Sequence, residues 1–195
     1  MAVADILISP AAVYVAATSS AQPTTAIGYG SSWGTAWTSL GYTLEPISIE
    51  YDNTIYELEV QQVMAPVKRV LQKEVVTMET VLAETTATNL KYALNGTVTT
   101  TAAGAGKGYD TIDAGGSTTL PEYQWGFEGF RVDSAGTAQP VRLFIRKGIS
   151  KMNGPLRFAK GAGVGTPLQI QAVPDLAQVA GKQLIQMHII TAPAT

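Results

Sequence analysis

The fold is indicated most clearly by a stretch that begins TLEPISIEYDNTIYELEVQQ, residues 43–62. Apolar and polar residues alternate along Thr43–Asp52 and again along Ile55–Gln62. Side chains on a strand point alternately to opposite faces, so each segment has one apolar face and one acidic face. Asp52-Asn53 lies between the two segments, and short Asx side chains favour turns. We therefore expect a β-hairpin with its turn at Asp52-Asn53.

A third alternating segment, Glu74–Ala83, continues this pattern. Its Val76, Met78 and Leu82 occupy alternate positions, which predicts that they face a core, whereas Glu79 belongs to the opposite, solvated face. Three strands that are acidic on one face and carry no catalytic cluster indicate a wall rather than a pocket.

One helix is predicted, over Glu84–Leu94. One of three threonines near its start can cap it, and Ala87, Leu90 and Leu94 form an apolar stripe at helical spacing. Asn95-Gly96 is expected to end the helix, because glycine adopts the left-handed conformation at little cost.

The rest of the chain consists of glycine-rich loops and short strands. Residues 99–119 are expected to form a long loop. Many short strands with a single helix predict an all-β fold, a sandwich or a barrel, in one domain spanning residues 1–195. The strands expected after the long loop are Glu122–Val132, Gln139–Ile149, Gly154–Phe158, Pro167–Ala172 and Gln183–Ile190.

Residues 1–40 are rich in Ala, Ser, Thr and Gly and are interpreted as an N-terminal arm. Only Ala12–Ala17 has the pattern of a strand. Trp33 and Trp37 argue against full disorder, since each offers a large apolar area that gains by burial. We expect an arm that becomes ordered only against a neighbouring subunit.

Composition narrows the class of protein. The absence of cysteine excludes disulfides and thiolate metal sites. A net charge of −2 gives no reason to expect binding to nucleic acid or to a membrane. Charged residues make up only 14% of the chain, against an average of about 25%. This indicates either a surface covered by neighbouring copies or a surface rich in Thr, Ser and Gly.

The start of the chain imitates a signal peptide through Ile6-Leu7-Ile8, but the first basic residue is Lys68. A secretory signal needs positive charge before its apolar run. In addition, no apolar run approaches the roughly 18 residues of a membrane span. We therefore expect synthesis and folding in the cytoplasm of the cell that makes it.

No motif supports catalysis or cofactor binding. Ala103–Gly108 resembles a phosphate-binding loop but lacks the hydroxyl that such a loop needs where Gly108 stands. His188 is the one histidine and is expected to be structural. Glu57 and Glu59 could serve a glycosidase, although two acids on one strand face more often form a solvated stripe. We expect no enzyme activity, no cofactor and no metal.

Charge is distributed unevenly along the chain. Residues 45–84 hold eight acids and three bases, whereas residues 131–160 hold seven bases and one acid. One interpretation is two solvated faces whose charges offset each other. The other is a head-to-tail interface in which the basic segment of one copy, with Arg142, Arg146 and Lys147, meets acids on the next.

Three segments together resemble a known family. They are Trp33–Thr43 (WGTAWTSLGYT), Ala65–Arg69 (APVKR) and Val75–Glu84 (VVTMETVLAE), the last leading directly into the expected helix. In this order they resemble the major tail tube proteins of long-tailed, siphovirus-type bacteriophages. The resemblance covers roughly residues 30–95, and the β-rich remainder agrees in type.

The resemblance implies a β-sandwich with a flanking helix, assembled as hexameric rings that stack into a hollow tube. In that family the inner sheets of six subunits join into one barrel through which DNA passes. The resemblance also implies a place in the virion tail, with tape-measure, tail-terminator and distal tail proteins as partners. The ring protein of type VI secretion systems and contractile tails share this architecture.

On this hypothesis an acidic inner face repels the DNA backbone, because Lys and Arg contacts to phosphate supply most non-specific affinity. Free strand edges pair readily, and here the hairpin edges would form the ring contact. The residues expected to face the lumen are Glu50, Asp52, Glu57, Glu59 and Glu79. The residues expected between subunits are Trp33, Trp37, Ile47, Ile49, Ile55, Leu58, Arg142, Arg146 and Lys147.

A second function of a different class fits the same sequence. A monomeric β-sandwich binding module, such as a virion decoration or carbohydrate-binding protein, would expose aromatic side chains on one face. Trp33, Trp37 and Trp125 are the candidates for that platform.

Overall fold

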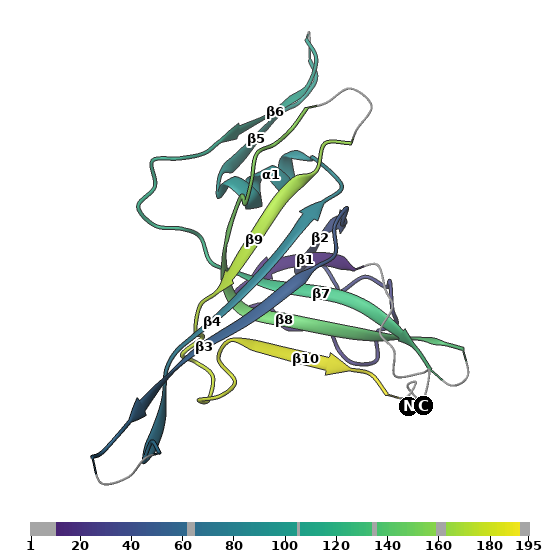
Figure 1. Cartoon of the computed structure of the whole chain (residues 1–195). Coiled ribbons are helices and arrows are strands. Elements are labelled where there is room, and N and C mark those ends of the chain that lie inside the picture. The colour runs from purple at the N-terminus through teal and green to yellow at the C-terminus, as the bar shows by residue number, and fades with distance from the viewer. Residues whose placement is uncertain (1–10, 62–64, 105, 134–135, 159–162, 192–195) are drawn as a thin grey trace.

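The computed structural model describes residues 11–61, 65–104, 106–133, 136–158 and 163–191. Within these residues the elements are β-strands with one short helix, as expected (Figure 1). The start of the chain that imitates a signal peptide lies outside the described residues. The elements are β1 (Ala12–Ala17), β2 (Trp37–Tyr42), β3 (Ser48–Leu58), β4 (Lys68–Leu82), α1 (Ala87–Leu94), β5 (Thr97–Thr101), β6 (Tyr109–Asp113), β7 (Tyr123–Val132), β8 (Ala138–Lys151), β9 (Thr166–Ala172) and β10 (Ile185–Ile189).

The main sheet is antiparallel and has the order β2-β1-β7-β8-β9-β4-β3, with β10 also paired to β8. Strand β8 is long enough to serve two layers, because residues 141–145 pair with β10 and residues 148–151 pair with β9. One layer is therefore β2-β1-β7-β8-β10, and the other is β9-β4-β3. Figure 1 shows the second layer crossing the first at a steep angle, with α1 and the separate β5–β6 hairpin at one end.

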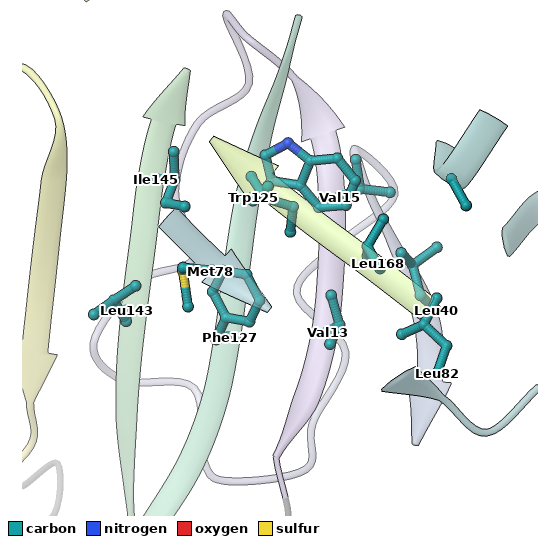
Figure 2. Packing of buried hydrophobic residues seen from close by; sticks show 12 residues of the cluster. Val13, Val15, Leu40, Met78, Leu82, Trp125, Phe127, Leu143, Ile145 and Leu168 are labelled. Atoms are coloured by element: carbon teal, nitrogen blue, oxygen red, sulfur yellow. The ribbon is translucent and has the colours of Figure 1, made fainter. Parts of the chain in front are cut away.

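The core lies between these two layers, which confirms the sandwich. Val76, Met78 and Leu82 of β4 are fully buried, as their alternation predicts. Figure 2 shows the apolar side chains of both layers gathered around Met78 and Phe127. The cluster comprises Val13, Val15, Leu40, Met78, Leu82, Ala93, Trp125, Phe127, Leu143, Ile145, Leu168 and Ile170.

The hairpin turn expected at Asp52-Asn53 is wrong. Both residues lie inside β3, which pairs with β4 from Ser48 opposite Glu79 to Leu58 opposite Lys68, with one shift of register after Thr54. The segment that was expected to begin at Glu74 is thus the second half of a fifteen-residue strand. Pairing of both flanking segments with the same partner strand overrides the turn preference of the Asx pair.

The helix begins later than expected, at Ala87, with the Thr86 hydroxyl accepting the N–H of Asn89 at 3.1 Å. Asn95, rather than Gly96, adopts the left-handed conformation, with φ of 53°. Its side-chain amide donates to the carbonyl of Ser150 at 2.6 Å, which ties the end of the helix to β8.

The buried face of α1 also differs from the expected stripe. Asn89 and Ala93 are buried, whereas Leu94 is 40% exposed. The Asn89 amide donates to the carbonyls of Leu40 and Glu84, at 3.0 Å and 2.7 Å. Those two hydrogen bonds make a polar side chain acceptable in the core position.

Two further predictions were wrong. Residues 99–119 contain most of the β5–β6 hairpin rather than one long loop, because threonine-rich β5 pairs with β6 and the Thr100 hydroxyl donates to Asp110 at 2.6 Å. Residues 154–158 form no strand in the described structure. The other late strands lie within two residues of their expected ends.

Candidate assembly surfaces

The β3–β4 hairpin is largely exposed and projects past the body of the sandwich (Figure 1). We call residues 48–60 and 67–75 the arm. Every residue of β3 is exposed, as are the first seven residues of β4. Its large apolar side chains are 38–51% exposed, and a contiguous exposed apolar surface marks an interaction site. They are Ile49, Tyr51, Ile55, Tyr56, Leu58, Val60, Val67, Val70 and Leu71.

The register of the arm decides which side chains share a face. Partners shift from Lys73 opposite Thr54 to Leu71 opposite Ile55, so Gln72 of β4 is the extra residue of a bulge. Strand β3 itself has no extra residue, and its alternation is therefore unbroken along all eleven residues. Even-numbered positions of β3 point to one face and odd-numbered positions to the other.

This alternation divides the expected acidic face. Glu50 and Asp52 share one face with Glu79, whose neighbour across the strands is Ser48. Glu57 lies on the opposite face, where it forms an ion pair with Arg69 at 2.7 Å. Glu59 lies past the end of β3. The expectation of one face for all five acids is wrong because it depended on a turn at Asp52-Asn53 that would have reset the alternation.

The arm has two parts of different character. Near the body, the face with Glu50 and Asp52 is polar, and the other face carries Ile49 and Tyr51. Tyr51 donates to Glu74 at 2.7 Å, and this hydrogen bond raises the pKa of the Tyr51 phenol.

Beyond Thr54, apolar side chains occupy both faces. Ile55 lies opposite Leu71 on one face, and Tyr56 lies opposite Val70 on the other. Charged side chains lie among them, such as the pair of Glu57 and Arg69, so neither face of the tip is wholly polar.

Three strands of the main sheet offer a free edge in the described part of the chain. Strand β3 pairs only with β4, β2 only with β1, and β10 only with β8. Between the edges of β3 and β10 lies an apolar groove of about 450 Å³, lined among others by Ile47, Ile49, Phe127, Leu143 and Met187. Ile47 thus packs against the core, while Ile49 reaches from the root of the arm into the mouth of the groove.

Arg142 does not belong to a basic outer surface, and its expected place between subunits is wrong. Its side chain is 0% exposed and forms an ion pair with Glu128 at 2.9 Å. It also donates to the carbonyls of Thr24 and Ile27 at 3.0 Å and 2.5 Å. A charge on the outer face of β8 is buried because residues 18–36 of the same chain cover that face.

The other two basic residues expected between subunits, Lys147 and Arg146, have partners within their own chain. Lys147 forms an ion pair with Glu122 at 2.7 Å. Arg146 donates through Nη2 to the side-chain oxygen of Gln186. Gln186 in turn lies 2.9 Å from Nε2 of His188. The pKa of His188 is lowered, first by burial and then by the positive charges of Arg142 and Arg146.

The tryptophans are buried by their own chain. Trp33 and Trp37 are 5% and 7% exposed, and Trp33 stacks on Tyr14 with ring centroids 4.1 Å apart. A Cβ atom at Gly126 would lie 2.2 Å from the Trp33 ring, so this close approach requires a glycine. The segment that carries Trp33 is therefore ordered without a second copy.

The three tryptophans expected to form an aromatic binding platform do not lie at the surface. Trp125 is 0% exposed in the central core, so all three candidate tryptophans are buried. The described residues also contain no group of three or more His, Cys, Asp or Glu that could hold a metal ion. None of the described helices is long and apolar enough to span a bilayer.

Residues 5–185 match the model of a family described as phage tail tube protein. The chain belongs to this family. It is accordingly a structural tail tube protein and a component of the virion tail. The comparison with curated proteins found no match. A solved structure titled "Crystal structure of Hcp protein" is similar over 94% of this chain and 100% of that chain, with 10% identity and a TM-score of 0.37.

Proposed function

We propose that this tail tube protein assembles as hexameric rings that stack into the tube and conduct DNA during ejection from a long-tailed phage. The observation that carries the proposal is the arm. It combines a free strand edge of eleven residues with an apolar tip that no other described part of the chain covers. A two-stranded hairpin without a third strand or a core is marginal in water.

Pairing between copies would complete the arm. A strand edge offers unpaired N–H and C=O groups, and addition of a strand from a second copy satisfies them. A head-to-tail contact of this kind closes into a ring when its rotation permits. We propose that Ile49, Ile55 and Leu58 lie in that contact and that Ile47 supports it from the groove.

The polar face at the root of the arm suits the lumen. Glu50, Asp52 and Glu79 share this face, and carboxylates repel the phosphates of passing DNA. Glu57 lies on the other face and is engaged by Arg69. We therefore propose a lumen lined by the first three acids only. Tape-measure, tail-terminator and distal tail proteins are the expected partners of such a tube.

The arm can be tested directly. Ile55→Asp with Leu71→Asp places charges on an opposed pair at the tip, and Tyr109→Asp places one on β6, where Tyr109 is 61% exposed. Purified protein is concentrated and imaged by negative-stain electron microscopy, with circular dichroism as a check of folding. We expect tubes or rings from the wild type and the Tyr109 variant, and folded single subunits from the arm variant. Tubes from the arm variant would refute the role of the tip.

A further inference from the structure

A polar recess of about 570 Å³ lies where the end of β1 meets the start of β7 and the 175–178 loop. Its lining comes from the segment that follows β1, from β7 and β8, and from that loop. The residues that matter below are Thr18, Ser19, Ser20, Gln22, Gln124 and Arg146.

Three buried polar atoms at this recess have no hydrogen-bond partner among the described residues. They are Nε2 of Gln22, Oε1 of Gln124 and Nε of Arg146. Gln124 is only 4% exposed. Buried polar atoms are nearly always hydrogen-bonded in native proteins, so three unpartnered ones at one recess call for a partner from outside the chain, ordered water or a ligand.

Arg146 supplies a positive charge at the recess. Lys147 is engaged by Glu122 at 2.7 Å, and the Asp175 carboxylate, which stays negatively charged, accepts the N–H of Ala177 at 3.2 Å. Arg146, in contrast, has a neutral amide as its side-chain partner and forms no ion pair within the described structure. The positive charge of Arg146 acts on a neighbouring group, since it contributes to the lowered pKa of His188.

We propose that this recess binds a phosphate group that keeps a hydroxyl, as hydrogen phosphate or as the protonated form of a phosphate monoester. Phosphate oxygens can accept from Nε–H of Arg146, from the Gln22 amide and from the hydroxyls of residues 18–20. The remaining P–OH can donate to Oε1 of Gln124. The recess thus offers several donors and one acceptor, which is the complement of that group.

The acceptor distinguishes phosphate from other anions. A carboxylate or a sulfate is fully ionised at neutral pH and has no proton to give to Gln124. With the Gln124 amide in this orientation, it would instead place a negative oxygen against a carbonyl oxygen. A phosphate monoester loses its last hydroxyl proton with a pKa of about 6, so it should bind more weakly as the pH rises above that value. Inorganic phosphate retains a hydroxyl throughout this range.

The test is calorimetric titration of the full chain with inorganic phosphate, sulfate and glycerol phosphate at matched ionic strength. We expect saturable binding of phosphate at one site per chain, at least tenfold tighter than sulfate. Glycerol phosphate should bind at pH 6 and weaken at pH 8, and equal binding at both would exclude a role for the hydroxyl. Equal affinity for phosphate and sulfate would overturn the proposal, as would the absence of saturation.

Variants locate the site. Arg146→Gln should weaken phosphate binding at least tenfold, whereas Arg157→Gln makes the same change of charge at an exposed position outside the recess and should leave binding unchanged. Thermal melting checks that both variants fold. An NMR titration of the wild-type protein needs no variant. In it, phosphate should shift the side-chain amide resonances of Gln22 and the Nε–H resonance of Arg146. Unshifted resonances, or equal loss in both variants, would refute the assignment. Tube assembly is not required for any of these results.

Discussion

The buried ion pair between Glu128 and Arg142 should be the most sensitive polar contact of this tail tube protein. Both side chains are at most 1% exposed. Glu128 also accepts from the backbone N–H of Gly30 at 3.0 Å and from the indole N–H of Trp33 at 3.3 Å. Glu128→Ala therefore leaves a buried guanidinium without its counter-charge and two donors without an acceptor.

The expected loss follows from burial. Removing one partner of a buried ion pair costs about 3–5 kcal/mol. For a chain of this length each kcal/mol lowers the melting temperature by roughly 2–4 °C, so we expect a decrease of about 6–20 °C. The pair of Lys147 and Glu122 provides a matched control, because its side chains are 31% and 35% exposed. Glu122→Ala should cost about 1 kcal/mol or less.

The assay is thermal and urea denaturation of dilute protein, since assembly would add concentration-dependent stability. Adding Arg142→Ala to Glu128→Ala removes the unpaired charge, so the double variant should lose less than the sum of the two single losses. Equal losses of stability for Glu128→Ala and Glu122→Ala would show that the Glu128 site is solvated. The pair would then not hold residues 18–36 over β8.

Two further predictions concern pH and the lumen. Because the folded-state pKa of His188 lies below its ordinary value of about 6.5, the unfolded chain takes up the proton first, and stability falls as the pH drops from about 6.5 towards the folded pKa. His188→Gln should remove this part of the pH dependence in melting curves between pH 7.5 and 5, and an unchanged difference between the two pH values would contradict the lowered pKa. In virions, Glu50→Lys with Asp52→Lys should permit tube formation yet slow DNA release after receptor triggering. Asp110→Lys with Asp113→Lys, the same charge change on β6, should release DNA at the wild-type rate, and normal release by the first variant would count against its place in the lumen.

Alternation predicted the core well and the arm poorly. Val76, Met78 and Leu82 could be assigned to a buried face because one face of β4 is covered by its own chain along those residues. The same pattern in β3 suggested a turn at Asp52-Asn53, since local turn preference was the only available signal there. Register with a partner strand is a long-range property, and a bulge at Gln72 on that partner cannot be read from β3 itself.

The buried ion pair could have been inferred from the sequence. Glu128 lies between apolar residues of β7, and Arg142 lies between Val141 and Leu143 of β8. Charged residues at alternate positions of two strands normally indicate a solvated face. Here residues 18–36 cover that face, and their Ala, Ser, Thr and Gly content gave no sign of it. A complementary pair on neighbouring strands was the clue, because opposite charges can face each other directly across antiparallel strands.

The arm limits how the tube can be built. At its root, one face is polar and the other lies towards the groove. Only the face towards the groove needs to be covered there, and the polar face can stay in contact with water. Beyond Thr54, both faces carry apolar pairs, Ile55 with Leu71 and Tyr56 with Val70, and the charged pair of Glu57 and Arg69 lies on one of them. A surface that lines an aqueous channel cannot include this tip without exposing apolar area to water. In the proposed tube, therefore, only the root of each arm lines the lumen, and each tip must be covered on both faces by neighbouring subunits.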